Sequence, residues 1–502
     1  MLSAKRPMNG RSATIGDLFP EARGGPSAGV TASRLASDSR KVTPGSVFVA
    51  VPGSKADGGA FIPQAVAAGA VAIVGESARP AGLDERVAYV TVPDVRRSLA
   101  LAAARLHPRQ PGTVVAVTGT SGKSSVADFA RQLFAALGHP AASVGTLGVL
   151  TSGGAAYGSL TTPDPLTLHE TLDRLAGEGI THLAMEASSH GLDQRRLDGV
   201  RLKAGGYTNL GHDHLDYHET MAYYRQAKLR LFETLLPDDA AAVVNADGAL
   251  AELFLEAAAA RGLRVLSTGR AGDTLKLAGA ARDGFAQRLS VLFQRAGAPA
   301  LPFDVALPLV GDFQAENALL AAGLVLAAEG DDAAEAVFAA FADLRGVPGR
   351  LERIGEVRGA LCIVDYAHKP DALEHVLDAL RPFTSGRLVC VFGCGGDRDR
   401  GKRPVMGRIA SERADIVIVT DDNPRGEQPA AIRAEILAGA PGAREIGDRA
   451  EAIGAAVAAL GPGDVLVVAG KGHETGQIIG DRTLPFSDHE VLRAAIARVA
   501  HG

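Results

Sequence analysis

The sequence of 502 residues predicts an α/β protein built from three domains. Apolar strand-like runs alternate with helical patterns along most of the chain, which is typical of α/β folds. The chain is also longer than one ordinary domain of roughly 150 residues. Two Pro/Gly-rich stretches, at 108–112 and 347–349, break the alternation. They predict domains at residues 1–110, 111–347 and 348–502.

The first domain is predicted to be a small α/β unit. Short strand-like runs at 47–51, 71–74 and 88–92 lie between Gly/Pro turns, and an Ala-rich helix at 95–106 closes the domain. The prolines and the glycine at 108–112 cannot continue that helix, so a linker is expected there.

The central domain is predicted to be a parallel sheet of the P-loop type. An apolar run at 113–118 enters a glycine loop and a helix at 123–137, and further strands are expected at 182–185, 206–209, 241–245 and 264–267. Helical patterns between these strands imply crossover connections and therefore a parallel sheet. Residues 274–309 alternate with frequent turns, which predicts an added antiparallel region before a helix at 314–328.

The third domain is predicted to be a doubly wound, Rossmann-like sheet, because strand and helix signals alternate regularly from 361–364 to 488–499. Four polar, charged loops follow four of its strands, at 365–368, 395–398, 421–425 and 470–474. Ligands of such sheets bind at the carboxyl ends of the strands. Each loop alone is weakly specific, but their shared placement predicts one crevice.

Composition and charge restrict the class of protein. Hydrophobic residues at 46% suffice for a sizeable core, which excludes a disordered chain. The 52 Lys and Arg against 57 Asp and Glu give a net charge of −5, which argues against general nucleic-acid binding or a polybasic membrane contact. The three cysteines, Cys362, Cys390 and Cys394, fit a reducing compartment. No secretory signal or membrane-length apolar run is readable, so we expect a cytoplasmic protein.

The strongest local signal is the glycine loop Gly119-Thr120-Ser121-Gly122-Lys123-Ser124-Ser125. Backbone N–H groups between a strand and a helix form an anion cradle, with Lys123 expected at the β- and γ-phosphates and Ser124 at Mg²⁺. The loop has two residues, where the usual P-loop has four, between its glycines. A plain glycine turn with an exposed lysine is the alternative, and the flanking strand and helix favour the phosphate site.

Three downstream features are candidates for metal or catalytic chemistry. Glu186 follows the strand at 182–185, where either a metal ligand or a capped loop residue is expected. The His/Asp cluster at 212–218 is compatible with a polar loop or zinc, but no cysteine is near and phosphate chemistry favours Mg²⁺. Lys228 shares a core-facing helical register with Tyr224 and Phe232, and this spacing alone favours a snorkelling lysine over a functional one.

Taken together, these segments resemble the Mur ligases, the ATP-dependent amino-acid-adding enzymes of peptidoglycan synthesis. The resemblance extends from Asp38-Ser39-Arg40 to the loop at 470–474 and is closest to the type that adds the third residue. Asp422-Asn423-Pro424-Arg425 matches the pattern of relatives that add meso-diaminopimelate, whereas lysine-adding relatives lack this arginine. The resemblance implies ATP, a UDP-N-acetylmuramoyl-dipeptide and meso-diaminopimelate as partners of a monomer, with no nucleic acid or membrane.

The resemblance also implies roles for individual residues. In the UDP-binding first domain, Ser37 and Ser39 would contact the UDP group. In the central domain, the muramoyl-dipeptide would be held by Thr161, Thr162, Ser188, Gln194 and Arg196. ATP would be bound by the glycine loop with Asn317, Arg350 and Asp365. Diaminopimelate would be bound by Arg398, Asp422, Asn423, Pro424, Arg425, Gly470 and Glu474. The catalytic group would consist of Lys123, Glu186, His214 and Lys228.

Two Mg²⁺ ions are implied, with ligands Ser124, Glu186, His214 and Lys228 as a CO₂-derived carbamate. This reverses the snorkelling interpretation of Lys228, because a carbamate offers anionic oxygens that suit Mg²⁺. The implied reaction phosphorylates the terminal glutamyl carboxylate, and the diaminopimelate amine then displaces phosphate. A lysine-adding Mur ligase, a folylpolyglutamate synthetase-like ligase and a non-enzymatic P-loop switch remain the alternatives.

Overall fold

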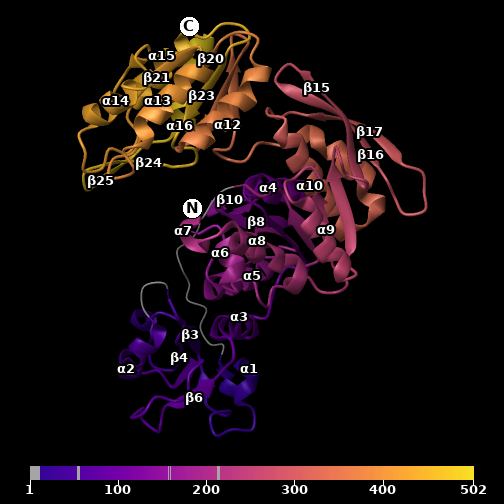
Figure 1. Ribbon diagram of the computed structural model, residues 1–502, viewed down its shortest axis with the longest axis vertical. Helices are drawn as coiled ribbons and strands as arrows, with labels where there is room; N and C mark the ends of the chain where they lie inside the picture. The colour runs from indigo at the N-terminus through magenta and orange to yellow at the C-terminus, as the bar shows by residue number, and fades with distance from the viewer. Residues whose placement is uncertain (1–11, 54–56, 157, 159, 212–214, 502) are drawn as a thin grey trace. The chain divides into compact units, whose positions relative to one another are not determined.

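The computed structural model describes residues 12–53, 57–156, 158, 160–211 and 215–501 (Figure 1). The chain forms two compact units. The first holds residues 1–123, 137–266 and 327–330, and the second holds 124–136, 267–326 and 331–502. Among the described residues, none of the helices combines the length and the apolar character needed to cross a membrane.

A small sheet occupies the N-terminal part of the first unit. Its order is β3-β4-β5-β6, with bounds Arg34–Ala36, Ser46–Val49, Ala72–Gly75 and Ala88–Thr91. Every pairing is parallel. Helix α2 spans Ile62–Ala67, and α3 spans Val95–Leu106 with its N-cap Asp94 accepting from the backbone N–H of Arg97. The short pair β1 (Ala13–Thr14) and β2 (Thr31–Ala32) completes this α/β region.

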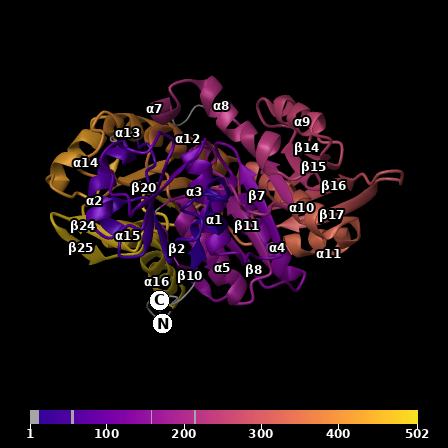
Figure 2. The same cartoon turned by 90° about the horizontal axis from the view of Figure 1, so that it is seen from below.

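The first unit also contains the central sheet, in the order β10-β9-β8-β11-β7-β12-β13, followed by the first three residues of β14. The five strands from β8 to β13 in this order are parallel to their neighbours where register is defined, and Figure 2 shows β7, β11 and β8 side by side. Strand bounds are Thr113–Thr118 (β7), Ala141–Gly145 (β8), Gly148–Thr151 (β9), Gly154–Ala156 (β10), His182–Glu186 (β11), Ala204–Tyr207 (β12), Ala241–Asn245 (β13) and Arg264–Gly269 (β14). The helices are α5 (Pro165–Gly177), α6 (Ser189–Asp193), α7 (Leu215–His218), α8 (Met221–Arg230) and α9 (Ala251–Ala260).

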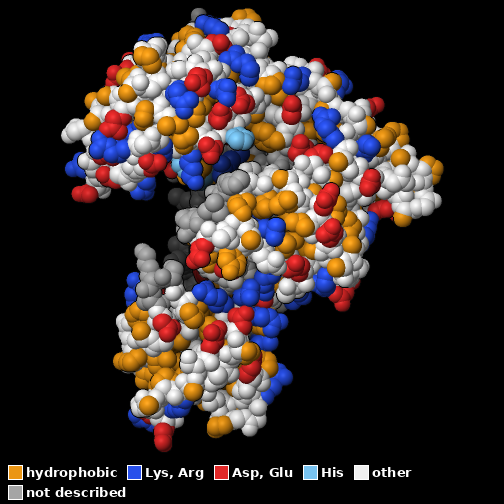
Figure 3. Space-filling view, in the orientation of Figure 1, with side chains coloured by type: hydrophobic (Ala, Val, Ile, Leu, Met, Phe, Trp, Pro, Cys, Tyr) orange, Lys and Arg blue, Asp and Glu red, His pale blue; other side chains and the backbone are white. Residues whose placement is uncertain are grey.

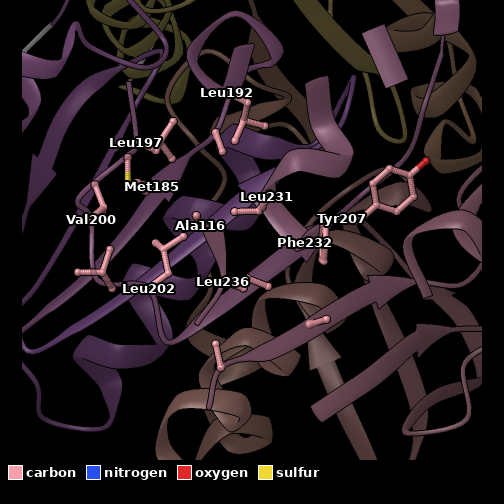
Figure 4. Packing of buried hydrophobic residues seen from close by; sticks show 14 of the residues in the cluster. Ala116, Met185, Leu192, Leu197, Val200, Leu202, Tyr207, Leu231, Phe232 and Leu236 are labelled. Carbon is pink, nitrogen blue, oxygen red and sulfur yellow. The ribbon is translucent and has the colours of Figure 1, made fainter. Parts of the chain in front are cut away.

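The core of this sheet explains its sequence. Strand β11 is buried along its whole length, as continuous apolar runs in parallel sheets usually are. Figure 4 shows the packing around Met185 and Phe232, which belong to one buried cluster. The Tyr207 ring stacks on Phe254 with 3.6 Å between ring centroids.

The second unit begins its own sheet region with antiparallel strands, as predicted for residues 274–309. Strands β15 (Leu275–Asp283), β16 (Ala286–Phe293) and β17 (Leu301–Leu307) pair antiparallel. Thr268 of β14 pairs with Leu275, which joins this region to the end of β14. Helices of this unit include α4 (Lys123–Ala136), most of α10 (Phe313–Glu329) and α11 (Ala334–Ala339).

A six-stranded sheet forms the C-terminal part of the second unit, in the order β18-β19-β23-β20-β21-β22. Only the pair β18–β19 is antiparallel. The strands are β18 (Glu352–Val357), β19 (Ala360–Asp365), β20 (Leu388–Phe392), β21 (Ile416–Val419), β22 (Arg444–Glu445) and β23 (Val465–Ala469), with a hairpin of β24 (Gly476–Ile479) and β25 (Arg482–Pro485). The helices are α12 (Pro370–Leu380), α13 (Lys402–Arg413), α14 (Pro429–Leu437), α15 (Arg449–Ala458) and α16 (Asp488–His501).

Burial and surface charge also follow the composition. All three cysteines are buried and form no disulfide, and burial raises the pKa of each thiol to about 12. Figure 3 shows Lys and Arg side chains interspersed with Asp and Glu side chains, as the small net charge of −5 suggests.

Some elements differ from the prediction. Strands β8, β9 and β10 are absent from the prediction, because their small residues give weak strand signals. Strand β12 lies at Ala204–Tyr207, two residues before the expected 206–209. The glycines of β12 weaken its strand signal in the sequence. They are needed for packing, because a Cβ on Gly205 would meet the Leu236 side chain at 3.0 Å.

Candidate functional site

The glycine loop lies at the carboxyl end of β7 and is held by the residues that follow β12. Thr120 N–H donates to the Asn209 carbonyl oxygen at 2.9 Å, and Ser121 N–H donates to Asn209 Oδ1 at 3.1 Å. The hydroxyl of Thr208 donates to the Ser121 carbonyl oxygen at 2.7 Å. Gly119 has φ +147°, and a Cβ there would lie 1.8 Å from Thr208 Oγ1. Only glycine therefore fits at the start of the loop.

Two lysines converge on this loop. Lys123 Nζ donates to the carbonyl oxygens of Gly119 and Thr120, at 2.9 and 2.8 Å. Lys228 Nζ donates to the same Gly119 oxygen at 2.7 Å and lies 4.4 Å from the centroid of the Tyr224 ring. The Lys228 residue is only 1% exposed, so the snorkelling interpretation from spacing is wrong. The Tyr224 hydroxyl shares a hydrogen bond of 3.0 Å with Thr120 Oγ1, which holds α8 against the loop.

Glu186 ends β11 beside the glycine loop, since it pairs with Val117 of β7. Thr146 donates to this carboxylate twice, from its N–H to Oε1 at 2.8 Å and from its hydroxyl to Oε2 at 3.3 Å. A Cβ on Gly145 would lie 2.1 Å from Oε1, so glycine makes room for the carboxylate. The site thus combines positive lysines with a buried carboxylate, the oxygen type that Mg²⁺ prefers.

The residues predicted for the muramoyl-dipeptide lie in one hydrogen-bonded network. Thr162 Oγ1 donates to the Glu186 carbonyl oxygen at 2.8 Å and accepts from Ser188 N–H at 3.0 Å. Arg196 donates to the Thr162 carbonyl oxygen and to Gln194 Oε1, both at 2.7 Å. Desolvation lowers the pKa of the Arg196 guanidinium. The network reaches Glu186, which places these side chains next to the candidate phosphate site.

The remaining residues predicted in the first unit are Thr161, Ser37, Ser39 and His214. Thr161 Oγ1 shares a hydrogen bond of 3.0 Å with Thr146 Oγ1, which itself donates to Glu186. Ser39 lies in the N-terminal sheet region, where its hydroxyl donates to Gln64 Oε1 at 2.8 Å, and Ser37 is exposed beside it. His214 lies outside the described residues.

The residues predicted to bind ATP outside the glycine loop lie in the second unit. Asp365 ends β19 and accepts from the N–H groups of Leu351 and Ala367, each at 2.7 Å. Desolvation raises its pKa. Its carboxylate therefore holds the backbone next to Arg350, whose guanidinium lies 5.3 Å from the Tyr366 ring centroid. Asn317, on α10, donates to Gln314 Oε1 at 3.1 Å.

The four loops predicted to converge in the third domain do meet. Gly470 N–H donates to the Asp365 carbonyl oxygen at 3.1 Å, which joins the loops after β23 and β19. Arg425 Nη1 donates to the Gly396 carbonyl oxygen at 3.0 Å, and Gly396 N–H donates to the Asn423 carbonyl oxygen at 2.9 Å. Parallel strands β19, β23, β20 and β21 bring these ends to one edge.

Arg425 is held in a defined backbone conformation. Its φ is +50°, in the left-handed region. The Arg425 N–H donates to the Ile478 carbonyl oxygen at 3.0 Å, and the Gly480 N–H donates to the Arg425 carbonyl oxygen at 2.8 Å. The hairpin β24–β25 thus supports the loop that carries this arginine. Arg398 is exposed nearby and donates to the Asp397 carbonyl oxygen at 3.0 Å.

Lys471 is the residue that the sequence analysis missed at this site. It is 0% exposed, and its Nζ donates to Asn423 Oδ1 at 2.7 Å and to the Gly476 carbonyl oxygen at 2.8 Å. It also lies 3.3 Å from Asp422 Oδ1 and 3.5 Å from Glu474 Oε2. The available signal was a lysine between two glycines directly after a buried strand.

A second buried cation, Arg403, connects two of the loops at this edge of the sheet. Arg403 is 0% exposed and forms ion pairs with Glu427 and Glu435, both at 2.8 Å. Hydrogen bonding to Arg403 lowers the pKa of Glu427 to about 2. Glu427 in turn accepts from the Asp397 N–H at 2.7 Å, so Arg403 ties the 397 loop to the 425 loop.

These observations define an α/β protein that has a glycine loop between a parallel strand and a helix, and a second sheet whose strand ends carry charged loops. Three family models match the chain in sequence order: "Mur ligase family, catalytic domain" at residues 32–107, "Mur ligase middle domain" at 117–325 and "Mur ligase, glutamate ligase domain" at 349–472. With the relatives described next, these matches show that the chain belongs to the Mur ligase family.

Curated relatives carry one name over nearly the whole chain. The UDP-N-acetylmuramoyl-L-alanyl-D-glutamate–2,6-diaminopimelate ligase of Bradyrhizobium diazoefficiens is 58% identical, covering 94% of this chain and 96% of its own. The ligase of the same name from Caulobacter vibrioides is 53% identical, covering 96% and 98%.

Solved structures agree with this relationship. A ligase structure of the same name is 34% identical, with a TM-score of 0.73 and coverage of 98% of this chain and 100% of that chain. The MurF ligase of Thermotoga maritima, solved in complex with ADP, is 20% identical, with a TM-score of 0.57 and coverage of 93% and 98%. At that identity the second likeness shows the fold alone.

Proposed function

We propose that this chain is an ATP-dependent, ADP-forming ligase that adds meso-2,6-diaminopimelate to UDP-N-acetylmuramoyl-L-alanyl-D-glutamate. The observation that carries the proposal is the identity of 58%, over 94% of the chain, to the Bradyrhizobium ligase of that name. The proposal places a monomer in cytoplasmic peptidoglycan precursor synthesis, with its UDP-binding, ATP-binding and amino-acid-binding domains at 1–110, 111–347 and 348–502.

The glycine loop supports the ATP part of the proposal. Lys123 Nζ now donates to two carbonyl oxygens of the loop, and phosphate oxygens of ATP would replace them as acceptors. The loop N–H groups and the N-terminal end of α4 add partial positive charge for the same anion. These groups lower the energy of the phosphoryl transfer electrostatically, and no side-chain nucleophile is required.

The same edge supports a magnesium site. Glu186 offers a buried carboxylate, and Ser124 and His214 are its proposed companions. Lys228 as an ammonium group has no lone pair for a metal, so it becomes a ligand only as the carbamate that CO₂ forms on Nζ. The hydrogen bond from Lys228 Nζ to the Gly119 carbonyl oxygen supports a carbamate position beside the glycine loop. Two Mg²⁺ ions, when bound, would offset the charge of the transferred phosphoryl group.

The proposed reaction proceeds in two steps. The terminal glutamyl carboxylate attacks the γ-phosphorus of ATP, forming an acyl phosphate and releasing ADP. The diaminopimelate amine then attacks the acyl carbon, so that the new C–N bond forms, inorganic phosphate leaves and the amine loses a proton. Thr162, Ser188, Gln194 and Arg196 are the proposed holders of the dipeptide during both steps.

The loop cluster of the third domain supports diaminopimelate as the amino acid. Glu474 and Asp422 supply carboxylates for the ammonium end, while Arg425 can bind the second carboxylate with two parallel hydrogen bonds. Arg398, Asn423, Pro424 and Gly470 are the further proposed contacts. Lysine lacks the second carboxylate, so its binding would leave Arg425 desolvated and unpaired.

Phosphate release tests the proposal directly. The purified chain is given ATP and the UDP-dipeptide, together with diaminopimelate, lysine or no amino acid. We expect release only with all three substrates, and much faster release with diaminopimelate. Preference for lysine would make the chain a lysine-adding ligase, and release with a folate in place of the UDP-dipeptide would make it folylpolyglutamate synthetase-like. Nucleotide binding without release would favour a P-loop switch.

A further inference from the structure

Two histidines and a glutamate lie together at the opposite ends of the central strands from the glycine loop. His182 is the first residue of β11, and it pairs in register with Ala141, the first residue of β8. His139 precedes β8 by two residues, and Glu329 is the last residue of α10. All three belong to the first unit.

The His–His–Glu cluster brings three candidate metal ligands together. His139 Nε2 lies 3.1 Å from Glu329 Oε2, and His182 Nε2 lies 2.9 Å from Oε1. The two rings stack with their centroids 3.9 Å apart and their planes at 25°, and one ligand atom from each residue lies within 4.8 Å of the others. Ligands bound tetrahedrally at zinc distances stand about 3.3 Å apart. In the structure the stacked rings direct their Nε2 atoms side by side, so the rings must separate, and the more exposed His139 ring must turn, before both Nε2 atoms face one ion.

We propose that His139, His182 and Glu329 bind a Zn²⁺ ion through the two Nε2 atoms and the carboxylate. Two imidazoles and one carboxylate suit zinc, and three protein ligands leave a fourth position for water. The side chains are 33%, 10% and 19% exposed, so the site is partly dehydrated while an ion can still enter from solvent. The negative end of the α10 dipole adds attraction for a cation at Glu329.

Thr181 supplies the outer hydrogen bond that a histidine ligand usually has. Its Oγ1 lies 2.9 Å from His182 Nδ1, and it donates to the Pro140 carbonyl oxygen at 3.3 Å. With zinc on Nε2, the His182 ring proton resides on Nδ1, which donates to Thr181 Oγ1. The Thr181 hydroxyl in turn donates to the Pro140 carbonyl oxygen. These two hydrogen bonds fix the tautomer and the ring orientation of His182 that metal binding needs.

The zinc site is separate from the proposed reaction. Strand β11 runs from His182 to Glu186, and four steps of about 3.3 Å place the two ends about 13 Å apart. The ion would instead join the start of β8, the start of β11 and the end of α10. We therefore assign it a structural role, in which zinc raises the thermal stability of the protein.

Calorimetric titration with Zn²⁺ alone tests the proposal. The full-length chain, stripped with a chelator and kept in excess Mg²⁺ to occupy hard-cation sites, is expected to bind one equivalent and to melt at a higher temperature. His182→Ala and Glu329→Gln should abolish this equivalent. Thr181→Val should weaken it by about 10- to 100-fold, as loss of an outer partner does. Co²⁺ absorption should report a site with nitrogen and oxygen ligands.

Two controls separate the outcomes. Glu186→Gln removes the carboxylate at the glycine loop and should leave zinc binding unchanged, and His375→Ala removes an exposed histidine of the second unit with the same expected result. Zinc binding that survives the cluster variants, that disappears with Glu186→Gln, or that is absent from the native chain overturns the proposal. The milder variant His139→Gln, at the most exposed ligand, guards against misfolding and should weaken binding in a folded protein.

Discussion

Lys123 and Lys228 donate to the same carbonyl oxygen, that of Gly119, although they come from different helices. Two positive groups this close repel each other unless an anion lies between them. Phosphate provides such an anion for Lys123. Conversion of Lys228 to a carbamate would remove the repulsion altogether, because the second group would then be negative.

Replacement of Lys228 tests this relationship. Lys228→Ala is expected to lower kcat at least about 100-fold, the usual effect of losing one preorganised charged group at a reacting centre. Added acetate should restore part of the rate if a carboxylate-like group is needed, and rates should rise with bicarbonate in the native enzyme. Lys203→Ala, at a lysine whose side chain is 52% exposed, is the matched control. Full activity of Lys228→Ala would contradict both the metal and the phosphate role.

Replacement of Arg425 tests amino-acid selection. Arg425→Ala should cost about 2 kcal/mol in kcat/KM for diaminopimelate, because a carboxylate partner is lost, while the KM for ATP stays unchanged. Discrimination against lysine should fall by a similar amount. Arg408→Ala, at a side chain that is 60% exposed, should change neither. Unaltered selectivity in Arg425→Ala would remove the specificity argument.

Replacement of Lys471 tests the buried cation of the same site. Lys471→Met leaves Asp422 and Glu474 without their cation, and breaking a buried pair costs about 3–5 kcal/mol. We expect a lower melting temperature and a higher KM for diaminopimelate, both measured on the purified variant. Lys276→Met, at an exposed lysine of the same unit, should match the native protein. A stable Lys471→Met protein with a normal KM would show that this lysine positions nothing.

His169 predicts how stability depends on pH. Desolvation lowers its pKa from 6.5 to about 4, and the residue is 0% exposed. Between these values the unfolded chain binds a proton that the folded chain does not, so acid favours unfolding. The free energy of unfolding should fall by about 3 kcal/mol from this group between pH 7 and pH 4. His169→Gln, which keeps an amide donor for the Asp198 carbonyl oxygen, should show a shallower decline in urea titrations. An unchanged decline would assign the acid sensitivity to other groups.

The elements predicted best are those with strong local signals. Helix α3 has the expected bounds because Asp94 caps its first turn. The family and the fold class are confirmed. Strand β12 was misplaced because two of its four residues are glycines, and its position depends on packing against Leu236 instead.

The sequence predicts which loops meet, through strand order, but not which distant side chains reach each loop. Local spacing identifies the glycine loop, but it does not show that Thr208 and Lys228 reach that loop from distant segments. Lys471 and Arg403 look like ordinary surface cations in the sequence, and only the folded chain reveals that both are fully buried. The assignment of individual residues to substrates stays a prediction.

The state of the cysteines has a practical consequence for chemistry applied to this protein. A thiol with a pKa near 12 holds almost no thiolate at neutral pH, and thiolate is the form that attacks electrophiles. Maleimides, iodoacetamide and cysteine-targeted covalent inhibitors should therefore leave the native enzyme untouched, and reductant should be dispensable in its storage buffer. Labelling that appears during heating or in urea would then serve as a clock for unfolding.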